Sequence, residues 1–255
     1  MTRTRSALLS TGSVVAALAA WLLLTEGGFV SPKVLVSPIG LVRQFWTLAI
    51  DGYLGTPLHV HVLASLLRTT FGFACGAILA LPVGLAIGYS PTLHALLSPF
   101  LAVLRPIPVI AYIPLAILWF GIGEFSKVLL IAITSFLYMT INTAAGVKAI
   151  PEDVIRAALS LGASRLQLFA HVILPESLPY VFAGVRVGAA VSWAVVVSAE
   201  LIAAQQGLGY LIMDAATFFR IPAVYVGISL IGIIGFAIDR LISFAERRLV
   251  HWSAR

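Results

Sequence analysis

An all-α integral membrane protein is the fold class that the sequence predicts, because of its composition, its few charges and its long apolar runs. Of the 255 residues, 60% are hydrophobic and 10% are charged, and the mean hydropathy is +1.05. Soluble domains carry about 25% charged residues, so this chain lacks the polar surface that keeps a protein in water. A helix needs about 20 apolar residues to cross a bilayer, which leaves room for about five to seven spans. We therefore expect one compact membrane domain and no separate soluble catalytic domain.

Six apolar runs are candidates for the transmembrane helices. They cover residues 7–24, 69–88, 99–119, 127–147, 180–203 and 222–241. The first run follows a basic start and has no A-x-A cleavage pattern behind it, so we expect an uncleaved signal anchor. This organisation predicts an N-terminal anchor and extracytoplasmic segment over 1–60, a transmembrane domain over 61–245 and a cytoplasmic tail over 246–255.

The placement of Lys and Arg predicts that both ends of the chain lie in the cytoplasm, because membrane proteins keep these residues in cytoplasmic loops. With the N-terminus inside, the cytoplasmic side holds nine of them: Arg3, Arg5, Lys148, Arg156, Arg165, Arg240, Arg247, Arg248 and Arg255. The opposite side holds four: Lys33, Arg43, Lys127 and Arg220. The same rule accounts for the net charge of +6, so we expect no nucleic-acid partner.

Three prolines interrupt the third run, namely Pro106, Pro108 and Pro114. Each removes a backbone donor and disfavours helix just before it. Broken backbone is tolerated at membrane depth where protein or a wet cavity satisfies it. The segment is therefore either an element that lines a conduit or a static kink.

Glycine pairs four residues apart predict tight helix packing. They are Gly72 with Gly76, Gly84 with Gly88, and Gly184 with Gly188. This spacing lets helix backbones approach closely in lipid, where no hydrophobic force drives the helices together. The pairs are common in membrane proteins and do not identify a function.

The polar stretch 148–179 predicts two short helices outside the bilayer. Pro151 can begin the first, and the glycine at 162 ends it. Its polar arc comprises Glu152, Asp153, Arg156 and Ser160, and the rest of its surface is apolar. Such a helix either rests on the lipid interface or docks a cytoplasmic partner.

The second short helix begins at a capping box formed by Ser164 and Gln167. We expect Pro175 and Pro179 to stop this helix and to lead into the fifth span.

One part of this stretch resembles a known family motif. It reads Arg156-Ala157-Ala158-Leu159-Ser160-Leu161-Gly162, then nine further residues, then Val172-Ile173-Leu174-Pro175. The pattern is similar to the EAA loop of the permeases of binding-protein-dependent ABC importers. The glycine, the leucine-proline pair and both intervals fit, whereas Arg156 stands where the family motif has its glutamate. A role that rests on that carboxylate therefore does not carry over.

The resemblance runs from about residue 61 to residue 252 and is strongest to the taurine, sulfonate and nitrate branch, taurine importer permeases above all. Supporting stretches are Trp119-Phe120-Gly121-Ile122-Gly123-Glu124, Ala199-Glu200-Leu201-Ile202-Ala203-Ala204 and Gly207-Leu208-Gly209-Tyr210. It implies the type I importer fold in a bacterial inner membrane. It also implies a second permease copy, two cytoplasmic ATPase subunits and an extracytoplasmic substrate-binding protein.

In that family the EAA loop forms a coupling helix that seats in the ATPase. The resemblance assigns this role to residues 152–161, with Gly162 as the turn. The implied coupling residues are Glu152, Asp153, Arg156, Ala157, Ala158, Ser160, Leu161, Gly162, Ser164, Leu174 and Pro175.

The sequence has no phosphate loop of the form G-x-x-x-x-G-K-[ST]. We therefore expect a transport subunit that is not an enzyme and binds no cofactor, with ATP and Mg on the partner ATPase. His59 and His61 are two residues apart, but no further ligand is evident, so we expect no metal site. Cys75 is the single cysteine, so no disulfide forms within the chain.

Charged residues at the centre of a membrane cost about 2.5–3.5 kcal/mol, and Arg105 and Glu200 lie nearest that depth. One hypothesis is that Arg105 attracts an anionic head group such as sulfonate, while a hydrogen bond or ion pair holds Glu200. Pro108 and Tyr112 would lie on the same path. The alternative is that Arg105 and Glu200 pair with each other or reach an interface.

Three alternative functions are a secondary transporter, a membrane enzyme and an importer permease for another cargo. A self-sufficient secondary transporter would show an internal repeat of interrupted spans, which the sequence lacks. A membrane enzyme would need several ionisable residues at one depth, and these are sparse. Another cargo, such as nitrate, an aromatic acid or a thiamin precursor, is fully open, because the delivery protein carries much of the specificity.

Overall fold

The computed structural model describes residues 3–31 and 34–252, and within them the chain is all-α, as predicted. The α-helices are α1 (Arg3–Glu26), α2 (Pro38–Asp51), α3 (Leu58–Tyr89), α4 (Pro91–Leu104), α5 (Ile113–Phe120), α6 (Glu124–Lys148), α7 (Glu152–Ser160), α8 (Arg165–Leu168), α9 (Leu174–Ala203), α10 (Leu208–Thr217) and α11 (Ile221–Leu249). A 3-10 turn, η1 (Val109–Tyr112), precedes α5, and a π turn, η2 (Phe169–Ile173), joins α8 to α9. Lys33 and Arg255, both counted in the charge prediction, lie outside the described residues.

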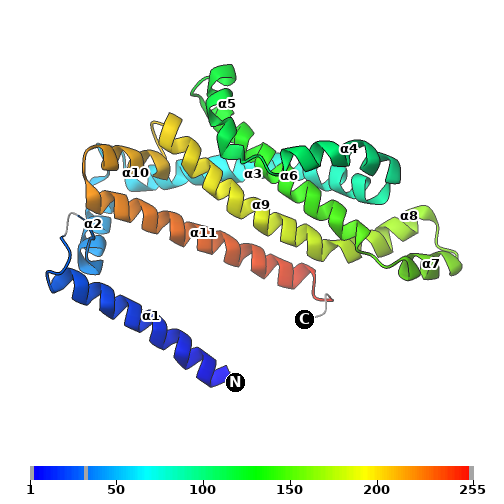
Figure 1. The fold of residues 1–255 in the computed structure, drawn as a ribbon, viewed down its shortest axis with the longest axis horizontal. Helices are drawn as coiled ribbons and strands as arrows, with labels where there is room; N and C mark the ends of the chain where they lie inside the picture. Colours follow the sequence, from blue (N-terminus) through cyan, green and yellow to red (C-terminus); the bar gives the residue numbers. More distant parts are fainter. Residues whose placement is uncertain (1–2, 32–33, 253–255) are drawn as a thin grey trace.

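Helices α3, α6 and α9 run lengthwise beside one another and form the centre of the molecule (Figure 1). The contact between α3 and α6 is so close that it requires glycine. A Cβ added at Gly76 would lie 2.0 Å from the Ser135 hydroxyl oxygen and 2.3 Å from the Ala132 carbonyl oxygen. Small residues allow such backbone approach when lipid supplies no hydrophobic drive.

The close contact extends along most of α3. At Gly72, Gly84 and Gly88, an added Cβ would lie 2.5–2.7 Å from a side-chain atom of α6. Gly184 of α9 also faces α6, at 2.9 Å, whereas Gly188 has only ordinary van der Waals neighbours at 3.4 Å or more. The prediction of tight packing is confirmed for five of the six glycines.

Four helices of the described chain are long and apolar enough to cross a bilayer: α3, α6, the continuous helix Arg165–Ala203, and α11. A fifth candidate combines α4 with residues 109–120, which are bent away from it by 80°. The predicted third span, 99–119, is therefore two helices, because Pro106 and Pro108 withhold backbone donors where the helix stops. Helix α1 covers the first predicted run, but the number of six spans and their orientation stay predictions.

Two shorter helices, α2 and α10, were not expected from the sequence. The Ser37 side chain caps α2 by accepting from the Gly40 N–H. The buried Tyr53 hydroxyl, between α2 and α3, donates to Asp214 of α10 at 2.6 Å. Burial, and then this hydrogen bond, raise the pKa of Tyr53 to about 12, so the phenol stays protonated and ties α10 to the start of α3.

At the opposite end of the core, helix α7 projects beyond the long helices (Figure 1). Four buried residues form a small hydrophobic cluster there: Val147, Ile150, Leu168 and Ile173. Ile155 and Ala158 of α7 pack against this cluster. One face of helix α7 is therefore attached to the end of α6 and to the segment of α8 and η2 that leads into α9.

The prediction that Pro175 and Pro179 stop the second short helix is wrong. Helix α8 begins at the predicted capping box of Ser164 and Gln167, and then continues through the π turn into α9. In that turn the Leu174 N–H bonds to the Phe169 carbonyl, five residues back. This wider spacing lets the helix pass Pro175, which stands in the first turn of α9, where a missing N–H costs little.

The glycine contact predicts a large effect of one substitution. Gly76→Val should lower the free energy of unfolding by about 3 kcal/mol or more, because backbone atoms of α6 cannot move away from the new side chain. Unfolding of the purified protein in mixed micelles by sodium dodecyl sulfate measures this difference. The control is Gly232→Ala in α11, where an added Cβ meets nothing within 4 Å. Equal stability of the two variants would contradict the packing described here.

Candidate functional site

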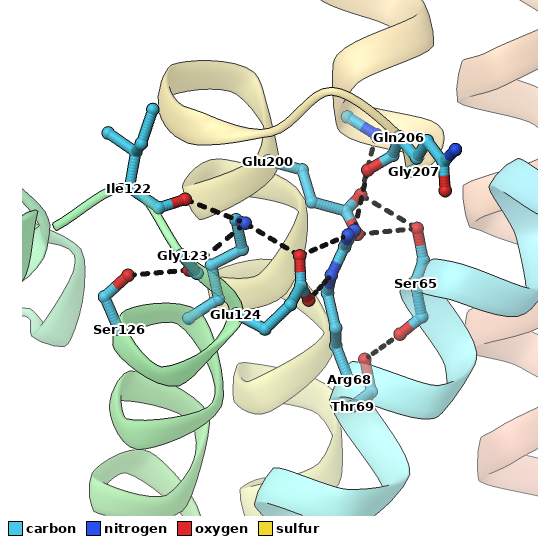
Figure 2. Close-up of polar contacts among 12 residues, drawn as sticks. Ser65, Arg68, Thr69, Ile122, Gly123, Glu124, Ser126, Glu200, Gln206 and Gly207 are labelled. Atoms are coloured by element: carbon cyan, nitrogen blue, oxygen red, sulfur yellow. Dashed lines mark hydrogen bonds and ion pairs between the residues drawn. The ribbon is translucent and has the colours of Figure 1, made fainter. Parts of the chain in front are cut away.

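Two groups of residues at opposite ends of the α3–α6–α9 core are candidates for function. The first is the exposed segment of α7 and its following turn. The second is a polar cluster at the other end, made of Ser65, Arg68, Glu124, Lys127 and Glu200. Figure 2 labels all of these except Lys127.

The expected coupling residues lie together at the exposed end of the molecule. Eight of them are exposed: Glu152, Asp153, Arg156, Ala157, Ser160, Leu161, Gly162 and Ser164. Ala158, Leu174 and Pro175 are half-buried at the base of the segment. The expected Glu152–Arg156 ion pair is present, and Gly162 takes a φ of +82°, a left-handed conformation that favours glycine.

Apolar side chains stand exposed among these polar ones. Leu161 is 89% exposed and Leu166 is 77% exposed, on either side of the Gly162 turn. Leu159 is also exposed, at 49%. Two largely exposed leucines on either side of this turn form a surface that gains free energy when a partner covers it.

In the polar cluster, the Arg68 guanidinium joins three parts of the chain. Its Nε and Nη2 donate to the two carboxylate oxygens of Glu124, at 2.5 and 2.9 Å. Its Nη1 donates to Glu200 and to the Gln206 carbonyl, each at 2.7 Å. Arg68 thereby connects α3 with the start of α6, the end of α9 and the loop after α9.

The Glu200 carboxylate is fully buried and saturated with donors. Besides Arg68, it accepts from the Ser65 hydroxyl at 2.8 Å and from the Gly209 N–H at 3.0 Å. Gly207 has a φ of +128°, and a Cβ there would lie 2.3 Å from the carboxylate. The loop can therefore pass over Glu200 only because residue 207 is glycine.

Glu124 has a different environment from Glu200, because its side chain is 62% exposed. It also accepts from the buried Lys127 ammonium at 3.1 Å. Lys127 donates to the carbonyls of Ile122 and Gly123 as well, both at 3.3 Å. An open cleft of about 600 Å³ lies beside these groups, bordered by residues 122–124 and 202–206 together with Arg68 and Lys127.

The residues of the expected translocation path do not share one site. Glu200 pairs with Arg68 and not with Arg105. Arg105 is exposed and lines a separate cavity of about 230 Å³ with His94 and Lys148. Tyr112 lines an apolar groove between α5 and α6, and Pro108 is exposed between α4 and η1. Of this set, only Glu200 lies in the polar cluster, and an ion pair holds it.

Arg68, Glu124 and Lys127 were not expected to act together. The second apolar run was expected to begin at position 69, with Arg68 at its end, whereas α3 begins at Leu58 and places Arg68 well inside the helix. A usable signal was present, because the predicted orientation puts residue 68, residue 127 and residue 200 at the same end of their spans. Their position at one end of the spans was therefore predictable, although the ion pairs between them were not.

No group of three His, Cys, Asp or Glu side chains is arranged to hold a metal ion in the described parts of the chain. His61 lies buried in α3, where its Nδ1 accepts from the Gly207 N–H at 3.2 Å. His61 thus supports the same loop that covers Glu200.

Comparison with known protein families identifies the family to which this chain is similar. The family described as "Binding-protein-dependent transport system inner membrane component" matches residues 72–251. The chain belongs to this family. It is therefore a multi-pass permease of the inner membrane, and the predicted family resemblance is confirmed.

Named relatives of this permease match it over nearly its whole length. It is 39% identical to the taurine transport system permease protein TauC of Escherichia coli (strain K12), over 97% of this chain and 90% of the relative. It is 38% identical to the putative aliphatic sulfonates transport permease protein SsuC of the same organism, over 94% and 89%. It is 31% identical to the nitrate import permease protein NrtB of Synechocystis sp., over 93% and 87%.

A solved structure shows the same fold. A chain of the MetNI methionine ABC transporter, in an inward-facing conformation, superposes with a TM-score of 0.65. The match covers 84% of this permease and 99% of that chain at 21% identity.

The polar cluster predicts a stability effect at one buried residue. Glu200→Gln should lower the free energy of unfolding by about 3 kcal/mol, because Arg68 and the loop over position 200 lose a buried charged partner. Thermal unfolding of the purified permease measures the change. As a control, Arg156→Ala removes an ion pair whose side chains are both more than 70% exposed, and should cost about 1 kcal/mol or less. A Glu200→Gln variant as stable as this control would contradict the role given to the pair.

Proposed function

We propose that this permease is the membrane subunit of an ATP-driven importer, in which α7 is the coupling helix. The complete transporter would contain two copies of the permease, two cytoplasmic ATPase subunits and an extracytoplasmic substrate-binding protein. Both chain termini and α7 would lie on the cytoplasmic side, as the distribution of Lys and Arg predicts. ATP and Mg would be bound by the ATPase, so the permease is a transport subunit and not an enzyme.

The observation that carries this proposal is the exposed turn at Leu161 and Leu166. A helix resting on lipid would turn its apolar face to the bilayer, but these leucines lie on a segment that projects beyond the long helices (Figure 1). A protein partner that covers them would gain about 25 cal/mol for each Å² of apolar surface buried.

The base of α7 supports the same mechanism. Ile155 and Ala158 pack on a cluster that includes Val147 from α6 and Ile173, the last residue of the π turn that leads into α9. A displacement of α7 by the ATPase would therefore push both of these long helices together. The small, exposed residues Ala157 and Gly162 leave room for the partner to approach closely.

The cargo is proposed to be a small anionic or zwitterionic solute, with taurine or another sulfonate as the first candidate. Support comes from relatives named for taurine, aliphatic sulfonates and nitrate, which share an oxyanion group. Nitrate, an aromatic acid or a thiamin precursor is the alternative within the same class. A self-sufficient secondary transporter is the lesser alternative, and it would not need the exposed α7 turn.

One substitution tests the coupling role. Leu161→Asp should abolish copurification of the ATPase with the tagged permease and stop ATP-dependent taurine uptake, because a carboxylate would be buried against the partner. Insertion of the permease into the membrane should be unchanged, because Leu161 contacts the core little. The permease, the ATPase and the substrate-binding protein are coexpressed. Affinity purification then measures ATPase binding, and an uptake assay measures transport.

Two variants serve as controls for this experiment. Leu161→Met keeps an apolar side chain of similar volume and should retain the ATPase. Leu54→Asp makes the same chemical change at a 56%-exposed leucine at the opposite end of the core, and should also retain it. Full ATPase binding and uptake by Leu161→Asp would refute the proposal.

A further inference from the structure

The charged side chains beside this cleft differ in how freely they can move out of the polar cluster. Its two cations, Arg68 and Lys127, are buried, with side chains 9% and 4% exposed. Of the two carboxylates that neutralise them, Glu200 is enclosed and saturated, whereas Glu124 is 62% exposed. Only Glu124 can therefore leave the cluster by a simple side-chain rotation.

Removal of Glu124 would create a site that attracts an anion. The cluster then keeps two positive charges and one negative charge, so its net charge becomes +1. Arg68 would present Nε and Nη2, the pair of donors that now holds both oxygens of Glu124. This fork matches any group with two oxygens on one centre, such as a carboxylate, a sulfonate or nitrate.

The backbone around the cleft adds to the attraction. Helix α6 has 25 residues and begins at Glu124, so the positive end of its dipole lies at the same point. Its N-cap residue, Gly123, provides no side-chain cap for the first-turn N–H groups. Gly123, Glu124 and Lys127 all line the cleft, so an anion there would meet both the helix terminus and the ammonium group.

We propose that this cleft is a transit site for the oxyanion group of the cargo, in which the Glu124 carboxylate occupies the position between Arg68 and Lys127 until the cargo displaces it. Figure 2 shows Glu124 beside Arg68. This inference rests on the proposed function, because it concerns the same anionic cargo. Glu200 has a different role, which is to hold the Arg68 guanidinium in place from the buried side. With no cargo, Glu124 pairs the buried Lys127 ammonium and accepts from the Arg68 donors that Glu200 does not occupy.

The site predicts opposite effects from two substitutions in the same cleft. Glu124→Gln removes the internal competitor and should tighten binding of taurine about tenfold, whereas Lys127→Met should weaken it at least about tenfold. If Glu124 and Lys127 were only structural, both changes would weaken binding or leave it unchanged. The opposite signs therefore distinguish the two roles.

The experiment measures equilibrium binding of radiolabelled taurine to the purified permease–ATPase complex without the delivery protein. Ethanesulfonate and nitrate serve as unlabelled competitors, and competition by ethanesulfonate shows that the sulfonate group is recognised without the amine. The matched control is Glu26→Gln, an exposed glutamate at the end of α1, which should change the Kd by less than about twofold. Unchanged or weaker binding in Glu124→Gln, or no binding in both the wild type and Glu124→Gln, would overturn the proposal.

A second variant, Glu124→Asp, keeps the proposal testable if Glu124→Gln assembles poorly. In Glu124→Asp the shorter side chain should reach Arg68 and Lys127 less well, so the Kd of taurine should lie between those of the wild type and of a protein without the carboxylate. No tightening in this variant would overturn the proposal as well.

Uptake by cells that carry the complete wild-type transporter separates this inference from the proposed function. Uptake of taurine, ethanesulfonate or nitrate, together with unaltered binding in the Glu124 variants, would overturn the transit site and leave the importer function standing. Absence of ATP-dependent uptake of all three would overturn the anionic cargo and the transit site together.

Discussion

The close contact between α3 and α6 is the constraint on which the other features of this permease depend. Its glycines allow the two backbones to meet from Gly72 to Gly88. Arg68 lies one helical turn before the first of these glycines, and Glu124 and Lys127 lie in the first turn of α6. The contact therefore brings the basic and acidic residues together at one end. At the other end it places Val147 beneath α7.

The polar cluster is compatible with a membrane protein because its charges are mutually satisfied. Burying a single ion costs several kcal/mol, and a pair offsets this cost only when its geometry is good and its remaining donors are occupied. Arg68 and Glu200 meet both conditions, with additional bonds from the Gln206 carbonyl, Ser65 and Gly209. The same low-dielectric environment makes the Arg68 and Lys127 cations strong anion attractors whenever Glu124 turns away.

Sequence patterns predicted the features that depend on composition and local periodicity. These include the all-α class, the glycine contacts, the capping box at Ser164 and the exposed helix after Pro151. The short helices α2 and α10 were missed because neither is long enough to form an apolar run of spanning length. The proline-rich third run was predicted to be irregular, but the 80° bend depends on how α5 packs on α6, which no local pattern encodes.

The cluster itself was only partly predictable. Glu200 was expected to be held by a hydrogen bond or an ion pair, and it is held by both. The predicted orientation puts Arg105 at the opposite end of its span from Glu200 and puts Arg68 at the same end, so Arg68 was the better partner on position alone. That Arg68 actually faces Glu200 depends on the rotation of α3 and α9 about their axes. That rotation is set by the glycine contacts of both helices with α6, so it follows from tertiary packing rather than from the charges.

Hydrogen–deuterium exchange of the purified permease and a Gly84→Val variant tests most directly whether the α3–α6 contact controls both ends. Gly84 lies in the second half of α3, where an added Cβ would be 2.7 Å from Thr143. We predict that the variant loses amide protection at both ends together, around residues 65–72 and 124–130 and also around 147–173. Loss of protection confined to the turns next to position 84, with both ends as protected as in the wild type, would contradict this account.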